Sequence, residues 1–349
     1  MKRIYLDYAS LTPIDKGVLK EMKKYSSEDY SNPSSIHASG IKAKKALEGA
    51  RVRTAKVLHA HEDEIIFTSG GTESNHLALK GNKVIISSTE HSSIIKQENT
   101  IKIPVDKNGL IDLEILKKSI TSETTLVSVM MVNNEIGSIQ PIQEIAKIVR
   151  DASKSFNKKI FFHTDACQAF MHLPIYVEKL GIDFLTLDGA KIYGPRGVGM
   201  LYVKRGTLEI ERAGTENLPG IMGFAYALEL GEKMREKETV HVSNLKNFFF
   251  SELQKLNKDI KVNGSLEHSS AHILNISIPN IDSEFFVLQL DAKGIECSTK
   301  SACLRDEDES YVLKAIGANS KTSVRFSFGR MTTQRDLKVV LKIIRENGI

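Results

Sequence analysis

Short hydrophobic runs, rich in β-branched residues, recur along the first part of the chain and alternate with helix-like stretches. Strands are predicted at Ile65–Thr68, Lys83–Ser88, Thr125–Val132, Lys159–His163, Asp183–Leu187 and Val198–Val203. Helices are predicted between them, at Asp112–Ile120 and Pro141–Lys154. The proline suits a first helical turn, because its missing N–H is not needed there. Regular alternation of this kind predicts an α/β fold with a mainly parallel central sheet flanked by helices.

The pattern changes after about Ala225. A long charged helical stretch covers Ala227–Leu256, and shorter strand candidates with a closing helix follow it. These later elements are Ala271–Ile278, Gly294–Ser298, Thr322–Phe328 and Gln334–Glu346. They predict a second, smaller α+β domain. We expect a large domain over residues 15–235, and a small domain built from residues 1–14 together with 236–349.

Composition narrows the class of protein. The 349 residues are 41% hydrophobic, which is enough for a large packed core. The net charge of +5 is small and spread along the chain, so no nucleic-acid binding is expected. No apolar run approaches the roughly 18 residues of a membrane span, and the N-terminus has no signal-peptide pattern. Three cysteines, an odd number, argue against a disulfide framework, and we therefore expect a cytoplasmic protein.

Polar side chains follow four of the predicted strands at the point where each strand ends. These groups are Thr89–His91, Asn133–Glu135, Asp165 with Gln168, and Asp188 with Lys191. Because the carboxyl ends of parallel strands meet at one edge of a sheet, where ligands bind, we expect these side chains to lie close together. Residues that serve only to form turns would not explain titratable or amide side chains after four separate strands.

A fifth group is the sequence TSGGTESN at residues 68–75. A predicted strand ends at Thr68, two glycines turn the chain, and a helix is expected to begin near Thr72. Backbone N–H groups at a helix N-terminus bind anions well. A tight turn with an N-cap would explain the same residues without a ligand.

Longer motifs match one family in order along nearly the whole chain. They are YLDYAS (5–10), NPSSIHASG (32–40), TSGGTESNHLALKG (68–81), STEH (88–91), VNNEIG (132–137), DACQ (165–168), AKIYGPRGVG (190–199), RAGTENLPG (212–220), SAC (301–303) and VRFSFGR (324–330). In these motifs the chain resembles the cysteine desulfurases of the class-V aminotransferase family. The resemblance implies a fold-type I pyridoxal-phosphate transferase that forms a homodimer, with no metal ion at its site.

The resemblance also implies roles for single residues. Lys191 would hold pyridoxal 5'-phosphate as a Schiff base, Asp165 would pair with the pyridinium nitrogen, and His91 would stack on the ring and move protons. Further cofactor-binding residues would be Gly71, Thr72, Asn134, Gln168, Asp188 and, reaching the neighbouring subunit, Thr215. Two plainer interpretations stay open, because Lys191 could be a solvated loop lysine and Asp165 could cap a helix beginning at Ala166.

The implied reaction converts L-cysteine to L-alanine. Asn32, Asn134 and Arg325 would bind the substrate, with the planar fork of the arginine on the carboxylate. The third catalytic residue, beside Lys191 and His91, would be Cys303. Its thiolate would take the sulfur as a persulfide and pass it to an acceptor, such as an iron–sulfur scaffold protein or a tRNA-thiolation partner. The cysteines at positions 167 and 297 are expected to have packing roles.

Three features depart from the family pattern. The residues Asp188-Gly189-Ala190 stand where the family has Ser-Gly-His, so phosphate affinity is lowered unless Asp188 turns away. The segment between Val203 and Arg212 lacks the usual glycine-rich stretch. Near the expected catalytic cysteine, the acidic run Asp306–Glu309 should raise the thiol pKa, and neighbouring cations should oppose this.

Two other functions remain compatible with the sequence. One is a related class-V activity, such as selenocysteine lyase or a β-lyase without a persulfide. The other is a degenerate family member that serves as a binding subunit, for which the altered residues before Lys191 are the support. Retention of Lys191, Asp165, Arg325 and Cys303 argues against the second.

Overall fold

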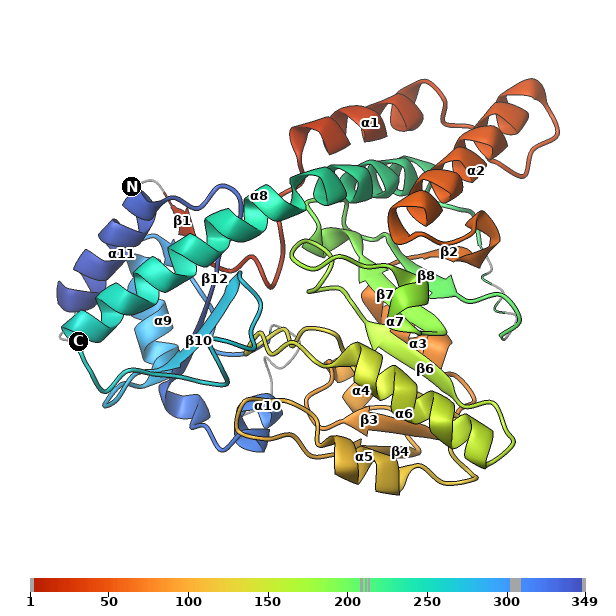
Figure 1. The fold of residues 1–349 in the computed structure, drawn as a ribbon. Coiled ribbons are helices and arrows are strands. Elements are labelled where there is room, and N and C mark those ends of the chain that lie inside the picture. Colours follow the sequence, from red (N-terminus) through yellow and green to blue (C-terminus); the bar gives the residue numbers. More distant parts are fainter. Residues whose placement is uncertain (1–2, 208–209, 211, 213, 302–308, 347–349) are drawn as a thin grey trace.

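A seven-stranded sheet forms the centre of the larger part of the molecule (Figure 1). The computed structural model describes residues 3–346 except 208–209, 211, 213 and 302–308, and all statements here refer to these residues. The strands are β2 (Ile65–Thr68), β3 (Val84–Ser87), β4 (Thr100–Ile103), β5 (Leu126–Ser128), β6 (Phe161–Asp165), β7 (Phe184–Asp188) and β8 (Gly199–Val203). In the order β2-β8-β7-β6-β5-β3-β4, only β8 runs antiparallel to its neighbours. The predicted mainly parallel sheet is confirmed.

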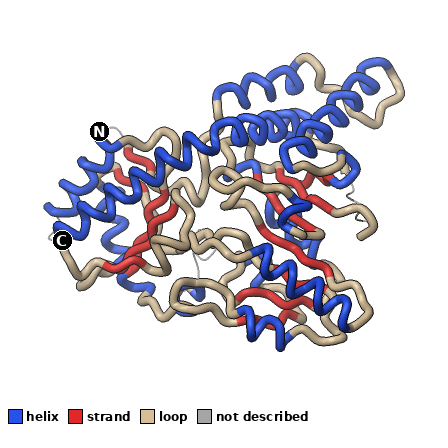
Figure 2. Tube along the Cα trace, in the orientation of Figure 1, coloured by secondary structure: helices blue, strands red, loops and turns tan. Residues whose placement is uncertain are grey.

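Helices cover this sheet (Figure 2). They are α1 (Lys16–Ser27), α2 (Ala38–Leu58), α3 (Gly71–Leu79), α4 (Ser92–Ile95), α5 (Leu113–Ser119), α6 (Ile142–Ser155), α7 (Val177–Leu180) and the first part of α8 (Leu218–Leu256), with short 3₁₀ turns at Glu62–Glu64 and Gly189–Lys191. Every residue of β8 is buried. Strands covered on both faces need continuous hydrophobic runs, which is why the sequence predicts them well.

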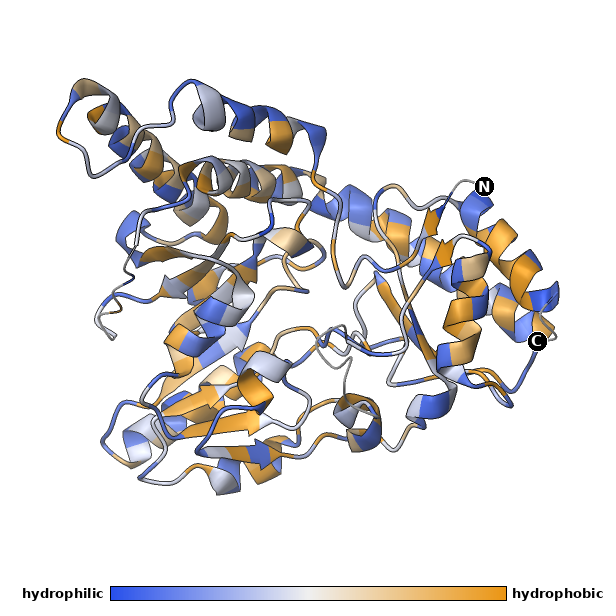
Figure 3. Cartoon of the chain, turned by 180° about the vertical axis from the view of Figure 1, so that it is seen from behind, coloured by the Kyte–Doolittle hydropathy of each residue, from blue (hydrophilic) through white to orange (hydrophobic). Residues whose placement is uncertain are grey.

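The smaller part of the molecule has its own sheets and core (Figures 1 and 3). Strand β10 (Ile273–Ser277) lies between β9 (Lys261–Val262) and β12 (Ser323–Ser327), and β1 (Ile4–Tyr5) pairs with β11 (Ile295–Glu296). Helices α9 (Ser283–Ala292), α10 (Tyr311–Ala315) and α11 (Gln334–Glu346) and a 3₁₀ turn at Ser320–Thr322 complete it. Ile4 and Leu6 are buried in this second core. Residues from both ends of the chain therefore pack together.

Helix α8 runs unbroken for 39 residues through both parts (Figure 1). The side chain of Asn217 caps its first turn by accepting from the Gly220 N–H. Leu218 and Leu228 lie in the first core, and Val242 and Leu253 lie in the second. The expected domain boundary at 235–236 falls inside this helix, so no linker marks it, and the division into domains stays a prediction.

Several elements lie outside the predicted set, including α1, α2, α9 and the edge strand β4. Two of the four residues of β4 are exposed, which hides it from a hydrophobicity pattern. The predicted strand Thr125–Val132 is regular only to Ser128, but Val129 N and Met131 N still donate to β6, at 3.1 and 2.9 Å. None of the described helices is long and apolar enough to span a membrane.

Candidate active site

A cavity of about 330 Å³ lies at the carboxyl ends of β5, β6 and β7. It is lined by nine of the residues that the sequence predicts for the site: Gly71, Thr72, His91, Asn134, Asp165, Gln168, Asp188, Lys191 and Arg325. They come from six separate segments of the chain. The structure therefore brings together groups that the sequence could only place on a common edge.

Lys191 ends the 3₁₀ turn that follows β7. Its Nζ donates to the carbonyl of Ala9 at 3.2 Å and to that of Ser10. The turn is tightly folded, because a Cβ on Gly189 would lie 2.5 Å from the carbonyl oxygen of Pro195. Lys191 is thus held against the cavity wall by backbone contacts, and the interpretation as a freely solvated loop lysine is wrong.

Asp165 is the last residue of β6, and its side chain is almost fully buried. One carboxylate oxygen accepts from Asn75 Nδ2 at 2.8 Å, and the other accepts from the Cys167 N–H at 3.0 Å. The residues after Asp165 form turns and no helix. The helix-cap interpretation is therefore wrong, and the carboxylate is held rigidly at the cavity.

His91 follows β3 and caps α4. Its Nδ1 accepts from the Ser93 N–H at 3.2 Å, so a neutral ring carries its proton on Nε2. The preceding residue, Glu90, is completely buried and accepts from the Met130 N–H at 2.9 Å. Burial raises the pKa of the Glu90 carboxyl well above its ordinary value, with Asp165 contributing in the same direction. Glu90 therefore anchors this strand end through its contact with the Met130 N–H.

Gln168 is oriented by a chain of hydrogen bonds. Its Nε2 donates to the Ala9 carbonyl at 2.8 Å, and its Oε1 lies 3.0 Å from Nε2 of His272. Burial lowers the pKa of His272 well below its ordinary value, so the ring is neutral. Because Oε1 can only accept, His272 carries its proton on Nε2, and its Nδ1 accepts from Ser270 Oγ at 2.6 Å. Gln168 is left with one amide N–H for the cavity.

Arg325 lies in β12, and its side chain is 1% exposed. Nη2 contacts Asp7 Oδ1 at 2.8 Å, and Nη1 donates to the Asn134 carbonyl at 2.8 Å. Its Nε has no hydrogen-bond partner among the described residues. A buried guanidinium with donors to spare on a cavity wall suits a carboxylate ligand.

The N-terminus of α3 forms the remaining wall, and a carboxylate of the chain already contacts it. Asp188 Oδ2 accepts from the Gly71 N–H at 3.0 Å, and Oδ1 accepts from the Ala190 N–H at 2.8 Å. Of the two orientations that the sequence leaves open, Asp188 therefore faces the anion cup and does not turn away.

The two described cysteines differ in exposure, since Cys297 is buried and Cys167 is half-buried and lines the cavity. Cys297 is buried in the second core, and burial raises the pKa of its thiol. Cys167 lies beneath the cup, where a Cβ on Gly71 would be 3.1 Å from its Sγ. Burial raises the pKa of this thiol well above its ordinary value, and the nearby carboxylates of Asp165 and Asp188 act in the same direction.

Two predicted site residues, Asn32 and Thr215, do not line the cavity of this chain and are exposed elsewhere. A third, Cys303, lies outside the described residues. Ser301, which directly precedes the segment that is not described, lines the cavity. Beyond that segment, Ser310 Oγ donates to Glu135 Oε2 at 2.6 Å.

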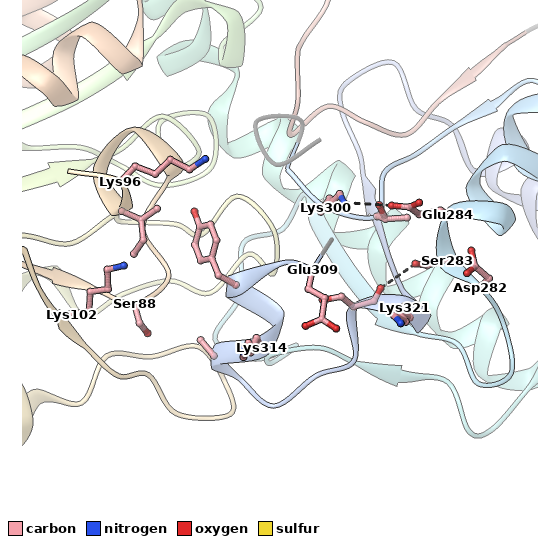
Figure 4. Close-up of a pocket in the computed structure, with 15 residues that line it drawn as sticks. Ser88, Lys96, Lys102, Asp282, Ser283, Glu284, Lys300, Glu309, Lys314 and Lys321 are labelled. Carbon is pink, nitrogen blue, oxygen red and sulfur yellow. Dashed lines mark hydrogen bonds and ion pairs between the residues drawn. The ribbon is translucent and has the colours of Figure 1, made fainter. Parts of the chain in front are cut away.

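A separate groove of about 1160 Å³ is lined in part by Thr299, Lys300 and Glu309 (Figure 4). Its walls come from β3–α4–β4 on one side and from α9, α10 and the Thr299–Lys300 stretch on the other. Lys300 is paired there with Glu284 at 3.4 Å. The groove shares no lining residue with the Lys191 cavity, so the two are distinct.

Three residues of the site were not singled out from the sequence: Asn75, Asp7 and His272. Asn75 and Asp7 lie within motifs that carry the resemblance, so motif membership was the available signal. His272 lies in a predicted strand, and no local pattern marks its contact with Gln168 across 104 positions.

Comparison with known proteins defines the class. The class-V aminotransferase profile matches residues 4–211 and 209–340, and the chain belongs to this family. It is 39% identical to the cysteine desulfurase IscS of Dictyoglomus turgidum, over 99% of this chain and 94% of the relative. A solved NifS-like protein has a TM-score of 0.89 at 32% identity, with 99% of both chains covered. SspA, solved in complex with cysteine, has a TM-score of 0.79 at 29% identity, over 94% of this chain and 99% of SspA.

The family uses pyridoxal 5'-phosphate, and the residues present fit this group. A fixed carboxylate, a half-buried amine and a histidine converge on one cavity that also meets a helix N-terminus. Asp165, Lys191 and His91 supply these three side chains. The donor set matches a cofactor with a ring nitrogen, an aldehyde and a phosphate.

Proposed function

We propose that this chain is a cysteine desulfurase, which converts L-cysteine to L-alanine and carries the sulfur as a persulfide on Cys303. The observation that carries the proposal is the convergence of Lys191, Asp165 and Arg325 on one cavity, with Ser301 on its wall two positions before Cys303. The name of the IscS relative and the cysteine complex of SspA support the same substrate.

The first steps would depend on a few side chains. Bound pyridoxal 5'-phosphate would supply an electron sink for the negative charge that develops at the substrate α-carbon. Lys191 would hold the cofactor covalently before substrate binds, and its free Nζ would accept the α-proton. Arg325 would hold the carboxylate, using donors that Asp7 and Asn134 leave unused. His91 would stack over the ring with its Nε2–H available for proton transfer.

The sulfur step would belong to Cys303. Its thiolate would attack the substrate sulfur, so that a new S–S bond forms and the C–S bond breaks. The electron pair of the broken bond would stay on the substrate carbon, which takes a proton and becomes the methyl group of L-alanine. An acceptor, such as an iron–sulfur scaffold protein or a tRNA-thiolation partner, could approach this segment from the groove in Figure 4.

The same proposal includes a homodimer and a cytoplasmic location. We expect a homodimer, because the stretch around Asn32 exposes Tyr30, Ile36 and Ile41 to solvent at 73, 94 and 49%. Such a dimer would give Asn32 and Thr215 a site in which to act. The odd number of cysteines favours a cytoplasmic location.

A direct test measures three products after L-cysteine is added to the purified protein: L-alanine, sulfide and protein-bound persulfide. We expect alanine and persulfide to appear together. Pyruvate and ammonia in place of alanine would instead identify a β-lyase, and preference for L-selenocysteine would identify a lyase for that substrate. Neither alternative is favoured by the relatives, and a non-catalytic role is not favoured by a site with its polar residues in place.

Replacing Arg325 with lysine should raise the KM for L-cysteine by about tenfold or more, because lysine keeps the charge but loses the planar fork. The charge opposite Asp7 is retained, so the fold should survive. The measurement is steady-state kinetics, with the absorbance of bound cofactor as the control. An unchanged KM would remove Arg325 from the substrate site.

Replacing His272 with phenylalanine should weaken pyridoxal 5'-phosphate binding about three- to tenfold, the value of one hydrogen bond. Without His272, the Gln168 carboxamide loses the contact that fixes its orientation. His172 provides a matched control, because it is buried and stacks on His272 at 4.1 Å without a bond to Gln168. Equal weakening in the two phenylalanine variants would mean that packing, and not orientation, is responsible. Cofactor titration measures both.

A further inference from the structure

The anion cup at the N-terminus of α3 is contacted by a side chain of the same molecule. Both oxygens of Asp188 accept backbone N–H groups, from Gly71 at 3.0 Å and from Ala190 at 2.8 Å. The first N–H groups of a helix have no partner within the helix, and they bind a carboxylate or a phosphate equally readily. Asp188 therefore bonds to a donor that a cofactor phosphate would also use.

Sheet register fixes this arrangement. Thr68, Gly199 and Asp188 lie in one row across β2, β8 and β7. A Cβ on Gly199 would lie 2.8 Å from the Cα of Gly70, so only glycine lets the turn before α3 lie this close to the sheet. The contact between Asp188 and Gly71 therefore depends on how closely these backbone segments pack, and not only on the side-chain rotamer of Asp188.

No cation of the described chain neutralises Asp188. The nearby amine of Lys191 donates instead to the carbonyls of Ala9 and Ser10. Arg212, at the same end of α3, is paired with Glu73 at 2.9 Å. A phosphate entering the cup would therefore meet an unpaired carboxylate at short range, where repulsion between like charges is strong.

We propose that Asp188 is a built-in competitor of the cofactor phosphate, which makes the hold on pyridoxal 5'-phosphate weak and readily exchangeable. The inference rests on the proposed function, since it concerns the cofactor of that site. The same carboxylate caps α3 and the turn before Lys191 in the cofactor-free protein. Asp188 thus stabilises the cofactor-free protein and destabilises the cofactor-bound protein.

The experiment compares cofactor binding by the wild-type protein, Asp188→Asn and Asp188→Ser, measured by fluorescence titration and by retention through dialysis. We expect the Kd for pyridoxal 5'-phosphate to fall about tenfold or more in both variants, because a negative charge is removed from the cup. The Kd for unphosphorylated pyridoxal should stay within about threefold, since this probe lacks the competing anion.

Glu73→Gln is the matched control. It removes one negative charge from the first turn of α3, at a side chain that contacts Ser69 and Arg212 and not the Gly71 N–H. Its Kd for pyridoxal 5'-phosphate should change by less than about threefold. In thermal unfolding, the cofactor-free Asp188→Asn protein should melt at a lower temperature than the cofactor-free wild type. Saturating cofactor should raise the melting temperature of Asp188→Asn by more than it raises that of the wild type.

Unchanged or weaker binding by both Asp188 variants would overturn the competitor role and leave the proposed function intact, provided that the wild type binds the cofactor. An equal gain for pyridoxal and its phosphate would also overturn it, because the effect would then not involve the phosphate. Failure of every protein to bind pyridoxal 5'-phosphate would remove the proposed function together with this inference.

Discussion

Replacing Lys191 with alanine should produce a protein without the visible absorbance of covalently held pyridoxal 5'-phosphate, and alanine formation should fall by about a thousandfold or more. The lysine would serve both as the covalent anchor and as the acceptor of the α-proton, so both functions would be lost at once. The backbone carbonyls of Ala9 and Ser10, which contact Nζ, would lose a donor but remain near the cavity. The fold should therefore survive.

The measurement is an absorbance spectrum before and after L-cysteine, together with the rate of alanine formation. Lys80 offers a control, because it is exposed at the end of α3 and lies outside the cavity. Lys80→Ala should keep both colour and rate. A Lys191→Ala protein that retained both would place the covalent link on another residue.

Replacing Cys303 with alanine should abolish persulfide formation and reduce desulfuration by about a thousandfold, while cofactor binding and the spectral response to L-cysteine remain. We expect desulfuration to be lost without loss of cofactor binding, because the thiol would act only after the substrate is bound. Cys297→Ala is the matched control, since that thiol is buried in the second core and does not line the cavity. It should lower stability slightly and leave desulfuration unchanged.

Mass spectrometry of the protein after L-cysteine treatment would detect the added sulfur on the peptide containing Cys303. Undiminished alanine production by Cys303→Ala would rule out Cys303 as the sulfur acceptor, because another thiol would then take the sulfur. Pyruvate and ammonia in place of alanine would instead show that the sulfur leaves by elimination, as in a lyase of the same family.

The parts of the fold that could be predicted from sequence are those determined by the residue pattern within a single segment. Strands β6 and β7 are almost wholly buried, and each opens on two hydrophobic residues, FF and FL. The polar residues after them, including Asp165 and Lys191, could be placed on one edge because parallel strands end together. That expectation is confirmed by a single cavity.

The remainder depends on contacts between distant segments. Asp7 meets Arg325 across 318 positions, and Asn75 meets Asp165 across 90. No periodicity within either segment encodes such a pair. The position of Asp188 was open for the same reason, because the sequence shows a carboxylate beside the lysine but not the row of residues across the sheet that aims it at Gly71.

The continuity of α8 has a practical consequence for anyone dividing this protein. Truncation at residues 235–236 would cut one helix into two pieces and remove a packing surface from both cores. Fragments made for co-expression, or chimaeras that exchange the C-terminal part with another chain, should therefore be joined at loops on either side of the helix. The boundary at residues 235–236 is therefore unsuitable as a place to cut the chain.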